Sequence, residues 1–286
     1  MSPPPIVQLF YNVKAGHYSP GRIDALVQAL RAAGAKVRLT PSADGLPQLA
    51  PDTTHVCVAG GDGTVRHVGA AVVNTNPALP LAIYPMGTVN LLAREAQVPR
   101  NPGKLAQLLV HGGADRPHHP VRVGNDMFFA CASAGPDSYA VASVSLRLKR
   151  WIGRLAYAVS FLHLLANWPR FNLRLSANGQ SWPCEAVFIA KGRYYAGPWS
   201  FAPQAQVGDG LLHVVALKTA RRRDFLGFCW SLLRGMDPGS GGNTIAFTCT
   251  ALRLDADELV PLQGDGDILG CCPLDMAVDA RAVQVR

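Results

Sequence analysis

The first hundred residues alternate between short apolar runs and segments with the apolar period of a helix. In residues 22–31, the side chains Ile23, Leu26, Val27 and Leu30 recur at intervals of three and four, which places them on one helix face. Further helices are predicted over residues 65–73 and 86–96. The apolar runs between them predict strands over residues 6–12, 36–40, 55–59 and 81–85. Strands that alternate with helices predict an α/β domain with an open parallel sheet, which we place at residues 1–120.

The pattern changes after about residue 120, where short strand-like segments follow one another with turns between them. Helical periods interrupt these segments twice, over residues 142–166 and 221–235. We therefore expect a second, mostly antiparallel domain of the β-sandwich type over residues 121–274. Residues 275–286 contain one more strand that could belong to either domain and could complete the first one.

Composition narrows the class of partner. The chain has 27 Lys and Arg against 19 Asp and Glu, a net charge of +8, which favours polyanionic partners such as nucleotides, nucleic acid or an acidic membrane face. No apolar run approaches the roughly 20 residues that a membrane-spanning helix needs. The seven cysteines have no CxxC spacing and are typical of free thiols in a reducing cytosol, so we expect a cytoplasmic protein.

Two glycine turns mark a candidate anion site. GGDGT, residues 60–64, leaves a predicted strand and enters a helix, where free N–H groups and the helix dipole attract anions. Glycines let phosphate oxygens approach the backbone closely. Asp62 would repel a phosphate unless it handles a metal ion or a proton. This turn therefore predicts a phosphate or nucleotide site.

The second turn lies in PMGTVNLLAR, residues 85–94, again at the end of a predicted strand. Gly87, Thr88 and Asn90 offer backbone and side-chain donors there. Because strand ends line one crevice of an open α/β sheet, we expect the two turns to meet. The alternative is that Thr88 only caps the following helix.

GGDGT followed by PxGTxNxxAR resembles the diacylglycerol kinase catalytic-domain family, which includes sphingosine, ceramide and bacterial lipid kinases. The first motif is shared with NAD kinases and phosphofructokinases. Similar motifs run through nearly the whole chain, in the family's order. They are Tyr11-Asn12 with Gly16, Thr40, the AGPDS turn at 134–138, the segment 192–215 and LQGDGD at 262–267.

The resemblance implies an ATP- and Mg²⁺-dependent lipid kinase with a NAD-kinase-like or phosphofructokinase-like nucleotide domain. Asp265 is the implied general base, with Asp62 as a second candidate, and Asp137 is an implied substrate residue. Asp209 would bind Mg²⁺ with backbone carbonyls near Gln206 and Leu211. The implied nucleotide-binding residues are Asn12, Thr40, Gly60, Gly61, Asp62, Gly63, Thr64, Val65, Arg66, Gly87, Thr88 and Asn90. Without the family, the Asp-Gly pairs at 209 and 265 would be read as simple turns.

The chain departs from the family pattern at four positions, namely Val13, His17, His67 and Asp267. His17 stands where relatives often have lysine, and Asp267 shortens the usual glutamate by one methylene. None of these changes removes Asp62, Asp209 or Asp265, so we expect activity, with substrate preference the open question.

The lipid acceptor, diacylglycerol or a sphingoid-type lipid, implies a membrane. Residues 145–165 carry an apolar helical face with arginines on its flank, which suits an anionic surface at the inner membrane face. The alternative is that this face packs on the second domain. Arg221, Arg222 and Arg223 form a second basic candidate. Nucleic acid is not expected, because basic residues are not interleaved with aromatic ones.

Two rival functions remain open. A kinase of a soluble substrate, as in NAD kinase, would act without membranes. A nucleotide or lipid sensor without catalysis would bind ligand and not turn it over, and the altered residues His67 and Asp267 are its only support.

Overall fold

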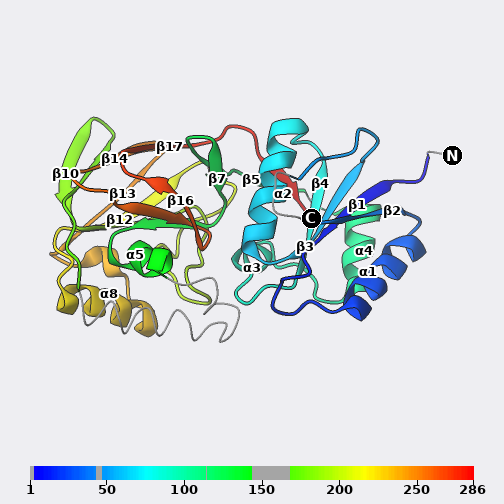
Figure 1. Cartoon of the computed structure of the whole chain (residues 1–286), viewed down its shortest axis with the longest axis horizontal. Coiled ribbons are helices and arrows are strands. Elements are labelled where there is room, and N and C mark those ends of the chain that lie inside the picture. The colour runs from blue at the N-terminus through cyan, green and yellow to red at the C-terminus, as the bar shows by residue number, and fades with distance from the viewer. Residues whose placement is uncertain (1–2, 43–46, 114, 144–167) are drawn as a thin grey trace. The chain divides into compact units, whose positions relative to one another are not determined.

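The computed structural model describes residues 3–42, 47–113, 115–143 and 168–286. The chain folds into two compact units (Figure 1). The first contains Met1–Pro120 and Ala280–Arg286, and the second contains Val121–Asp279. No helix among the described residues has the length and apolarity needed to cross a membrane.

The first unit is built on a six-stranded sheet of order β2-β1-β3-β4-β18-β5. Its strands are β1 (Ile6–Tyr11), β2 (Lys36–Pro41), β3 (His55–Gly60), β4 (Pro80–Pro85), β5 (Arg116–His118) and β18 (Val283–Val285). All neighbours run parallel except β5, which pairs antiparallel with β18. The predicted open parallel α/β sheet is confirmed.

Helices cover the sheet on both faces. They are α1 (Pro20–Ala32), α2 (Asp62–Thr75), α3 (Leu91–Glu95) and α4 (Pro102–His111). The predicted apolar stripe of α1 is buried and shares a core cluster with Leu105 and Leu109 of α4 and with Cys57 of β3. Side chains alternate along a strand, so the fully buried Val56 and Val58 of β3 face the other side, where α2 packs.

The helix predicted over residues 86–96 is shorter than expected. Residues 86–90 form a turn, and α3 begins only at Leu91. Asn90 has φ +55°, a left-handed conformation that cannot continue a helix. The helix α4 is not among the helices that the hydrophobic pattern predicts, although Asn101 caps it by accepting from Lys104 N (3.0 Å) and Pro102 opens its first turn.

The second unit is a β-sandwich, as predicted. One sheet has the order β10-β9-β14-β17-β6-β7 and the other β13-β12-β11-β8-β15-β16. The pairings within both sheets are antiparallel. The core between them contains Leu175 and Leu254 from the first sheet and Val187, Val214 and Leu262 from the second.

The strands of the first sheet are β6 (Val121–Val123), β7 (Asp126–Phe128), β9 (Leu173–Ala177), β10 (Gln180–Cys184), β14 (Ala251–Ala256) and β17 (Leu274–Val278). The second sheet is made of β8 (Cys131–Ala134), β11 (Ala186–Ala190), β12 (Leu212–Leu217), β13 (Thr244–Cys249), β15 (Pro261–Gly264) and β16 (Asp267–Cys271).

Among its described residues, the second unit also contains two helices and one 3-10 turn. The helix α8 (Arg222–Arg234) lies on the outer face of the second sheet (Figure 1), where Phe228 stacks on Phe188 of β11 at a centroid distance of 4.2 Å. The short helix α5 (Pro136–Ser143) begins inside AGPDS, a segment whose sequence predicts a turn. The 3-10 turn η1 spans Pro238–Ser240. The predicted amphipathic segment 145–165 lies outside the described residues.

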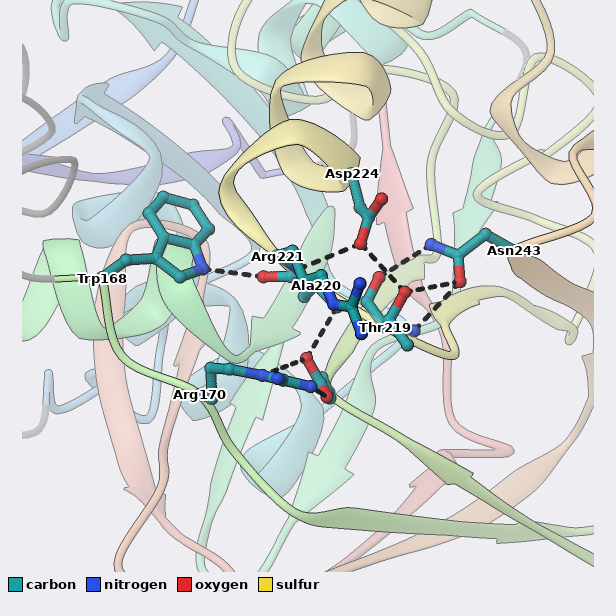
Figure 2. Close-up of polar contacts among 8 residues, drawn as sticks. Trp168, Arg170, Thr219, Ala220, Arg221, Asp224 and Asn243 are labelled. Carbon is teal, nitrogen blue, oxygen red and sulfur yellow. Dashed lines mark hydrogen bonds and ion pairs between the residues drawn. The ribbon is translucent and has the colours of Figure 1, made fainter.

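Polar contacts fix the connection from β12 to α8 (Figure 2). The carboxylate of Glu185 accepts from Ala220 N (2.8 Å) and from the guanidinium of Arg170. Trp168 Nε1 donates to Ala220 O (2.7 Å). The side-chain amide of Asn243 binds both the N–H (3.1 Å) and the C=O (2.7 Å) of Thr219. The start of α8 is therefore anchored to two neighbouring segments of the second unit.

The last twelve residues are shared between the units. The strand β17 pairs with β14 and β6 in the second unit, whereas β18 pairs with β4 and β5 in the first. Residues 275–279 therefore lie with the second unit, and only residues 280–286 return to the first sheet.

Candidate functional site

The two glycine turns touch at the carboxyl end of the first sheet. The strand β3 ends at Gly60, α2 begins at Asp62, and a Cβ added to Gly61 would lie 3.1 Å from Gly87 Cα. A Cβ on Gly87 would overlap Gly61 Cα, and one on Gly60 would lie 2.6 Å from Thr64 Cβ. Only glycine fits this approach of backbone to backbone, so the structure brings 60–64 and 87–90 together.

The peptide groups of Gly87 are clamped from two sides. Asn90 Oδ1 accepts from Gly87 N (2.8 Å), and Asn90 Nδ2 donates to Gly87 O (2.7 Å). His17 Nδ1 lies 2.9 Å from the same carbonyl, which can only accept, so this nitrogen donates. Arg22 donates to His17 O (2.8 Å) and Pro85 O (3.2 Å). Asn90 thus shapes the turn, and the sequence analysis did not foresee the roles of His17 and Arg22.

Thr88 is exposed, and the residue that precedes the first turn of α3 is Asn90. The alternative in which Thr88 caps this helix is therefore not observed. A Cβ on Gly16 would lie 3.3 Å from Thr88 Oγ1, which places the loop after β1 beside this hydroxyl. Thr88 is therefore an exposed residue of the joined glycine turns.

Asp62 connects the starts of two helices. It is the first residue of α2, and its Oδ1 accepts from Leu92 N at the start of α3 (3.2 Å). Burial raises the pKa of this carboxyl, against the opposing effect of N–H groups from Leu91, Leu92 and Asn90. A carboxylate interacts favourably with a helix N-terminus. Asp62 therefore has a structural task besides any role with a metal ion or proton.

The remaining nucleotide candidates lie on three elements. Asn12 follows β1 and donates to Thr64 Oγ1 (3.0 Å), so it fixes the first turn of α2. Within that helix Gly63 lies in the first turn, while Val65 and Arg66 are buried. Thr40 lies on β2, where its hydroxyl accepts from Gln8 Nε2 (3.1 Å).

In the second unit, Asp265 is held by the backbone. Its Oδ2 accepts from Phe129 N (2.6 Å), and its Oδ1 accepts from Ala130 N (2.9 Å) and Cys131 N (3.1 Å). The residue itself has φ +51° and is buried. An ionised carboxylate has about four acceptor positions. Three backbone donors orient Asp265, and they also tie residues 129–131 to the LQGDGD turn.

Asp137 lies at the start of α5, in a buried polar chain. Its Oδ2 accepts from Ser133 Oγ and from Tyr195 OH (2.7 Å), and Gln263 Nε2 donates to Ser133 Oγ (2.8 Å). Its Oδ1 is buried and has no hydrogen-bond partner among the residues that the structure describes. Burial raises the pKa of Asp137, despite the hydroxyl donors, and burial also raises the pKa of Tyr195 well above its usual value.

Ser133 and Tyr195 are not among the site residues expected from the sequence. Tyr195 belongs to GRYYAG and Gln263 to LQGDGD, two segments in which other residues carry the family motif. Ser133 precedes the AGPDS turn and carries no sequence signal of its own.

The proposed Mg²⁺ ligands contact a lysine. Lys191 Nζ donates to Gln206 O (3.1 Å) and to Asp209 Oδ1 (3.1 Å), which also accepts from Leu211 N (3.0 Å). Burial raises the pKa of Asp209, but the Leu211 N–H and the Lys191 ammonium outweigh it and hold this pKa below its usual value. A divalent ion would share these oxygens with a buried ammonium, so the residues present do not fit it.

Two family matches cover nearly the whole chain. Residues 7–120 match the diacylglycerol kinase catalytic domain. Residues 130–286 match the YegS C-terminal NAD kinase beta sandwich-like domain.

Relatives match over most of their length. A Pseudomonas aeruginosa protein named "Probable lipid kinase YegS-like" is 31% identical over 245 residues, which covers 83% of this chain and 78% of that protein. A protein of the same name from Pseudomonas fluorescens is 32% identical over 225 residues, covering 74% of this chain and 73% of the relative. The fold is similar to the crystal structure of a diacylglycerol kinase from Bacillus anthracis, with a TM-score of 0.76 at 21% identity, over 95% of this chain and 93% of that one.

Proposed function

Since the chain belongs to the YegS-like lipid kinase family and contains both of its domains in order, we propose that it transfers the γ-phosphoryl group of ATP to a lipid hydroxyl. The observation that carries this proposal is the contact between the glycine turns at Gly61 and Gly87. It leaves backbone N–H groups and the N-terminus of α2 at the edge of the sheet where open α/β folds bind phosphates.

The first unit would bind the nucleotide. Gly60, Gly61 and Gly63 let phosphate oxygens approach the start of α2, and the exposed Thr88 offers a hydroxyl donor. Asn12, Asn90 and the other residues that shape the turns would hold these donors in place before the ligand arrives, which is the preorganisation that phosphoryl transfer needs. ATP would enter as its Mg²⁺ complex, in which the metal neutralises charge on the phosphates.

The second unit would supply the proton chemistry. Three backbone donors orient the Asp265 carboxylate, and we propose that it takes the proton of the attacking lipid hydroxyl. The polar group of the substrate would bind near the hydrogen-bonded side chains of Asp137, Tyr195 and Ser133. Diacylglycerol or a sphingoid-type lipid offers the required hydroxyl.

The kinetics of Asp265→Asn test this assignment. A lost general base predicts a fall in kcat of about 10²–10⁴-fold, together with loss of the acidic limb of the pH profile of kcat/KM. A purely positioning role would lower activity and leave the acidic limb in place. Circular dichroism and urea unfolding of the variant show whether the fold survives the change at the 129–131 backbone contacts.

We also propose that the outer face of α8 docks on an anionic membrane. Leu226, Trp230 and Leu233 recur at intervals of four and three and are 44%, 54% and 56% exposed. Arginines precede and end the helix, and Arg234 lies over the Trp230 ring at 4.8 Å. Exposed apolar side chains with Trp and flanking cations suit the headgroup region of an anionic bilayer.

A further inference from the structure

Lys191 is a fully buried lysine that directly follows the last residue of β11. Its backbone N–H donates to Ala130 O (2.9 Å), and its side chain reaches the loop that precedes β12. There the ammonium contacts Gln206 O and Asp209 Oδ1, both at 3.1 Å. His213 Nε2 lies 3.3 Å from the other oxygen, Asp209 Oδ2.

The acceptors around this ammonium form the kind of ligand set that a hard cation uses. One carboxylate and one backbone carbonyl come from a short loop with an Asp-Gly turn, and oxygen ligands of this kind suit Mg²⁺ or Ca²⁺. An ammonium offers three donors and one positive charge, so it can satisfy the same oxygens. The described residues contain no group of three or more His, Cys, Asp or Glu side chains that could hold a metal ion.

The net charge decides whether the Lys191 ammonium and a divalent ion could both lie at these oxygens. Lys191 and Asp209 form an ion pair whose formal charges cancel, with the side chain of Asp209 25% exposed and that of Lys191 fully buried. A divalent ion on the same oxygens would add two positive charges beside the ammonium, in surroundings where charges are weakly screened. The lysine and the metal therefore exclude each other.

We propose that the Lys191 ammonium is a resident cation, covalently attached to the chain, that takes the place of a divalent metal ion at Gln206 and Asp209. It ties the end of β11 to the 206–211 loop at all times, so the conformation of this loop is independent of the divalent metal concentration. This inference concerns the second unit without nucleotide and does not depend on the proposed kinase activity.

Manganese binding to the full-length, nucleotide-free protein tests the inference. The electron paramagnetic resonance signal of free Mn²⁺ is titrated with wild type, Asp209→Asn, Lys191→Ala and the double variant. Wild type and Asp209→Asn should bind Mn²⁺ equally, because no site at Asp209 is open. Lys191→Ala should gain one site per chain that the double variant lacks.

Thermal unfolding gives an independent readout at constant ionic strength. We expect the Tm of wild type and the Tm of Asp209→Asn to respond to added Mg²⁺ in the same way, because neither protein has an open metal site at residue 209. The Tm of Lys191→Ala should start lower, because Asp209 loses its partner, and rise with added Mg²⁺ by linkage.

Two outcomes would overturn the inference. One is a Mn²⁺ site in wild type that Asp209→Asn removes, a comparison that needs no change at Lys191. The other is a folded Lys191→Ala that gains no Asp209-dependent site, since the lysine would then be an ordinary buried ion-pair partner. Should Lys191→Ala fail to fold without metal, refolding in the presence of Mg²⁺ but not of Na⁺ supports the inference, and failure in both contradicts it.

Discussion

At the scale of single residues, the candidate nucleotide site depends on positions where no side chain fits. Gly87 and Gly61 approach each other so closely that a methyl group on either must displace backbone. The side chains around them, Asn90 and His17 above all, are engaged in shaping this approach. The geometry of the candidate site therefore depends on the backbone, and the substitutions that should disturb it most are those that add a side chain to one of these glycines.

Gly87→Ala should disrupt the close contact between the backbones of Gly61 and Gly87. We expect a destabilisation of about 1–3 kcal/mol, because the added methyl overlaps Gly61 Cα and cannot be relieved by a side-chain rotation. The binding free energy for ATP, measured by calorimetry, should fall by at least as much as the free energy of unfolding. Gly21→Ala is the matched control, since Gly21 lies in α1 with no atom near its missing Cβ. It should leave ATP binding unchanged and should not lower stability, because alanine favours a helix more than glycine does.

Asp137 makes stability depend on pH in a specific direction. Its raised pKa means that the folded protein keeps a proton that the unfolded chain has released above about pH 4. Wild type should therefore lose stability as pH rises through this window, until it passes the folded pKa. Asp137→Asn keeps an acceptor for Ser133 and Tyr195 but cannot ionise, so it should lack this loss.

Urea unfolding of both proteins between pH 4 and pH 8 checks this prediction. The stability difference should shift in favour of Asp137→Asn with rising pH and then become constant. A difference that shifts in favour of wild type would show that Asp137 is stabilised as the anion. Asp257→Asn, at an exposed position, controls for the loss of one carboxylate.

Local sequence signals predicted the elements of the site but not the partners of its side chains. GGDGT and PMGTVN could be located because glycine turns after strands have a local signature. The hydrogen bonds of Asp265 come from residues more than 130 positions away, and the Lys191–Asp209 pair joins two ends of a long loop. Contacts between residues far apart in the sequence leave no periodicity or spacing that could predict them. The sequence therefore suggested the metal ligands but not the lysine beside them.

At the scale of elements, α8 combines a firm anchor with an exposed apolar face. Phe225, Phe228 and Leu232 pack into a core cluster on the second sheet, and the contacts in Figure 2 fix the segment before the helix. Leu226, Trp230 and Leu233 are left exposed. A rigid helix that presents such a face loses little conformational entropy when it binds a bilayer.

Replacing Trp230 and Leu233 by serine should weaken binding to vesicles that contain anionic lipid, because the substitution removes apolar area that would enter the headgroup region. Sedimentation with vesicles measures the bound fraction. Leu259→Ser is the control, since Leu259 is 82% exposed but lies outside α8.

High salt should release the wild-type protein in part, as screening weakens the contribution of the arginines. Equal binding by the α8 variant and by Leu259→Ser would contradict the assignment of the membrane surface to α8. Equal binding of wild type to neutral and anionic vesicles would contradict the role of charge.

At the scale of the whole molecule, the chain leaves the first unit and returns to it. The strand β18 lies between β4 and β5, and its residues Val283 and Val285 are buried. The first unit is thus completed by the last seven residues, which follow the whole second unit in the sequence. A sequence pattern could place a strand at the end of the chain, but only the pairing shows which sheet receives it.

Deletion of residues 280–286 should therefore destabilise the first unit, although most of that unit lies at the other end of the sequence. Without β18, the strand β4 becomes an unprotected sheet edge, which favours aggregation. We expect the truncated chain to lose ATP binding and to aggregate in size-exclusion chromatography. Deletion of residues 1–4, which precede β1, should leave both properties intact, and equal behaviour of the two truncations would contradict this account.

The most direct test of the proposed function is transfer of label from γ-labelled ATP to extractable lipid in mixed micelles. Wild type is compared with Gly87→Ala, and diacylglycerol, a sphingoid base and NAD are offered as acceptors. We predict label in a lipid with wild type, none in NAD, and loss of transfer in Gly87→Ala. Label that enters NAD alone, or ATP binding by folded wild type with no transfer to any acceptor, would contradict the assignment of a lipid kinase.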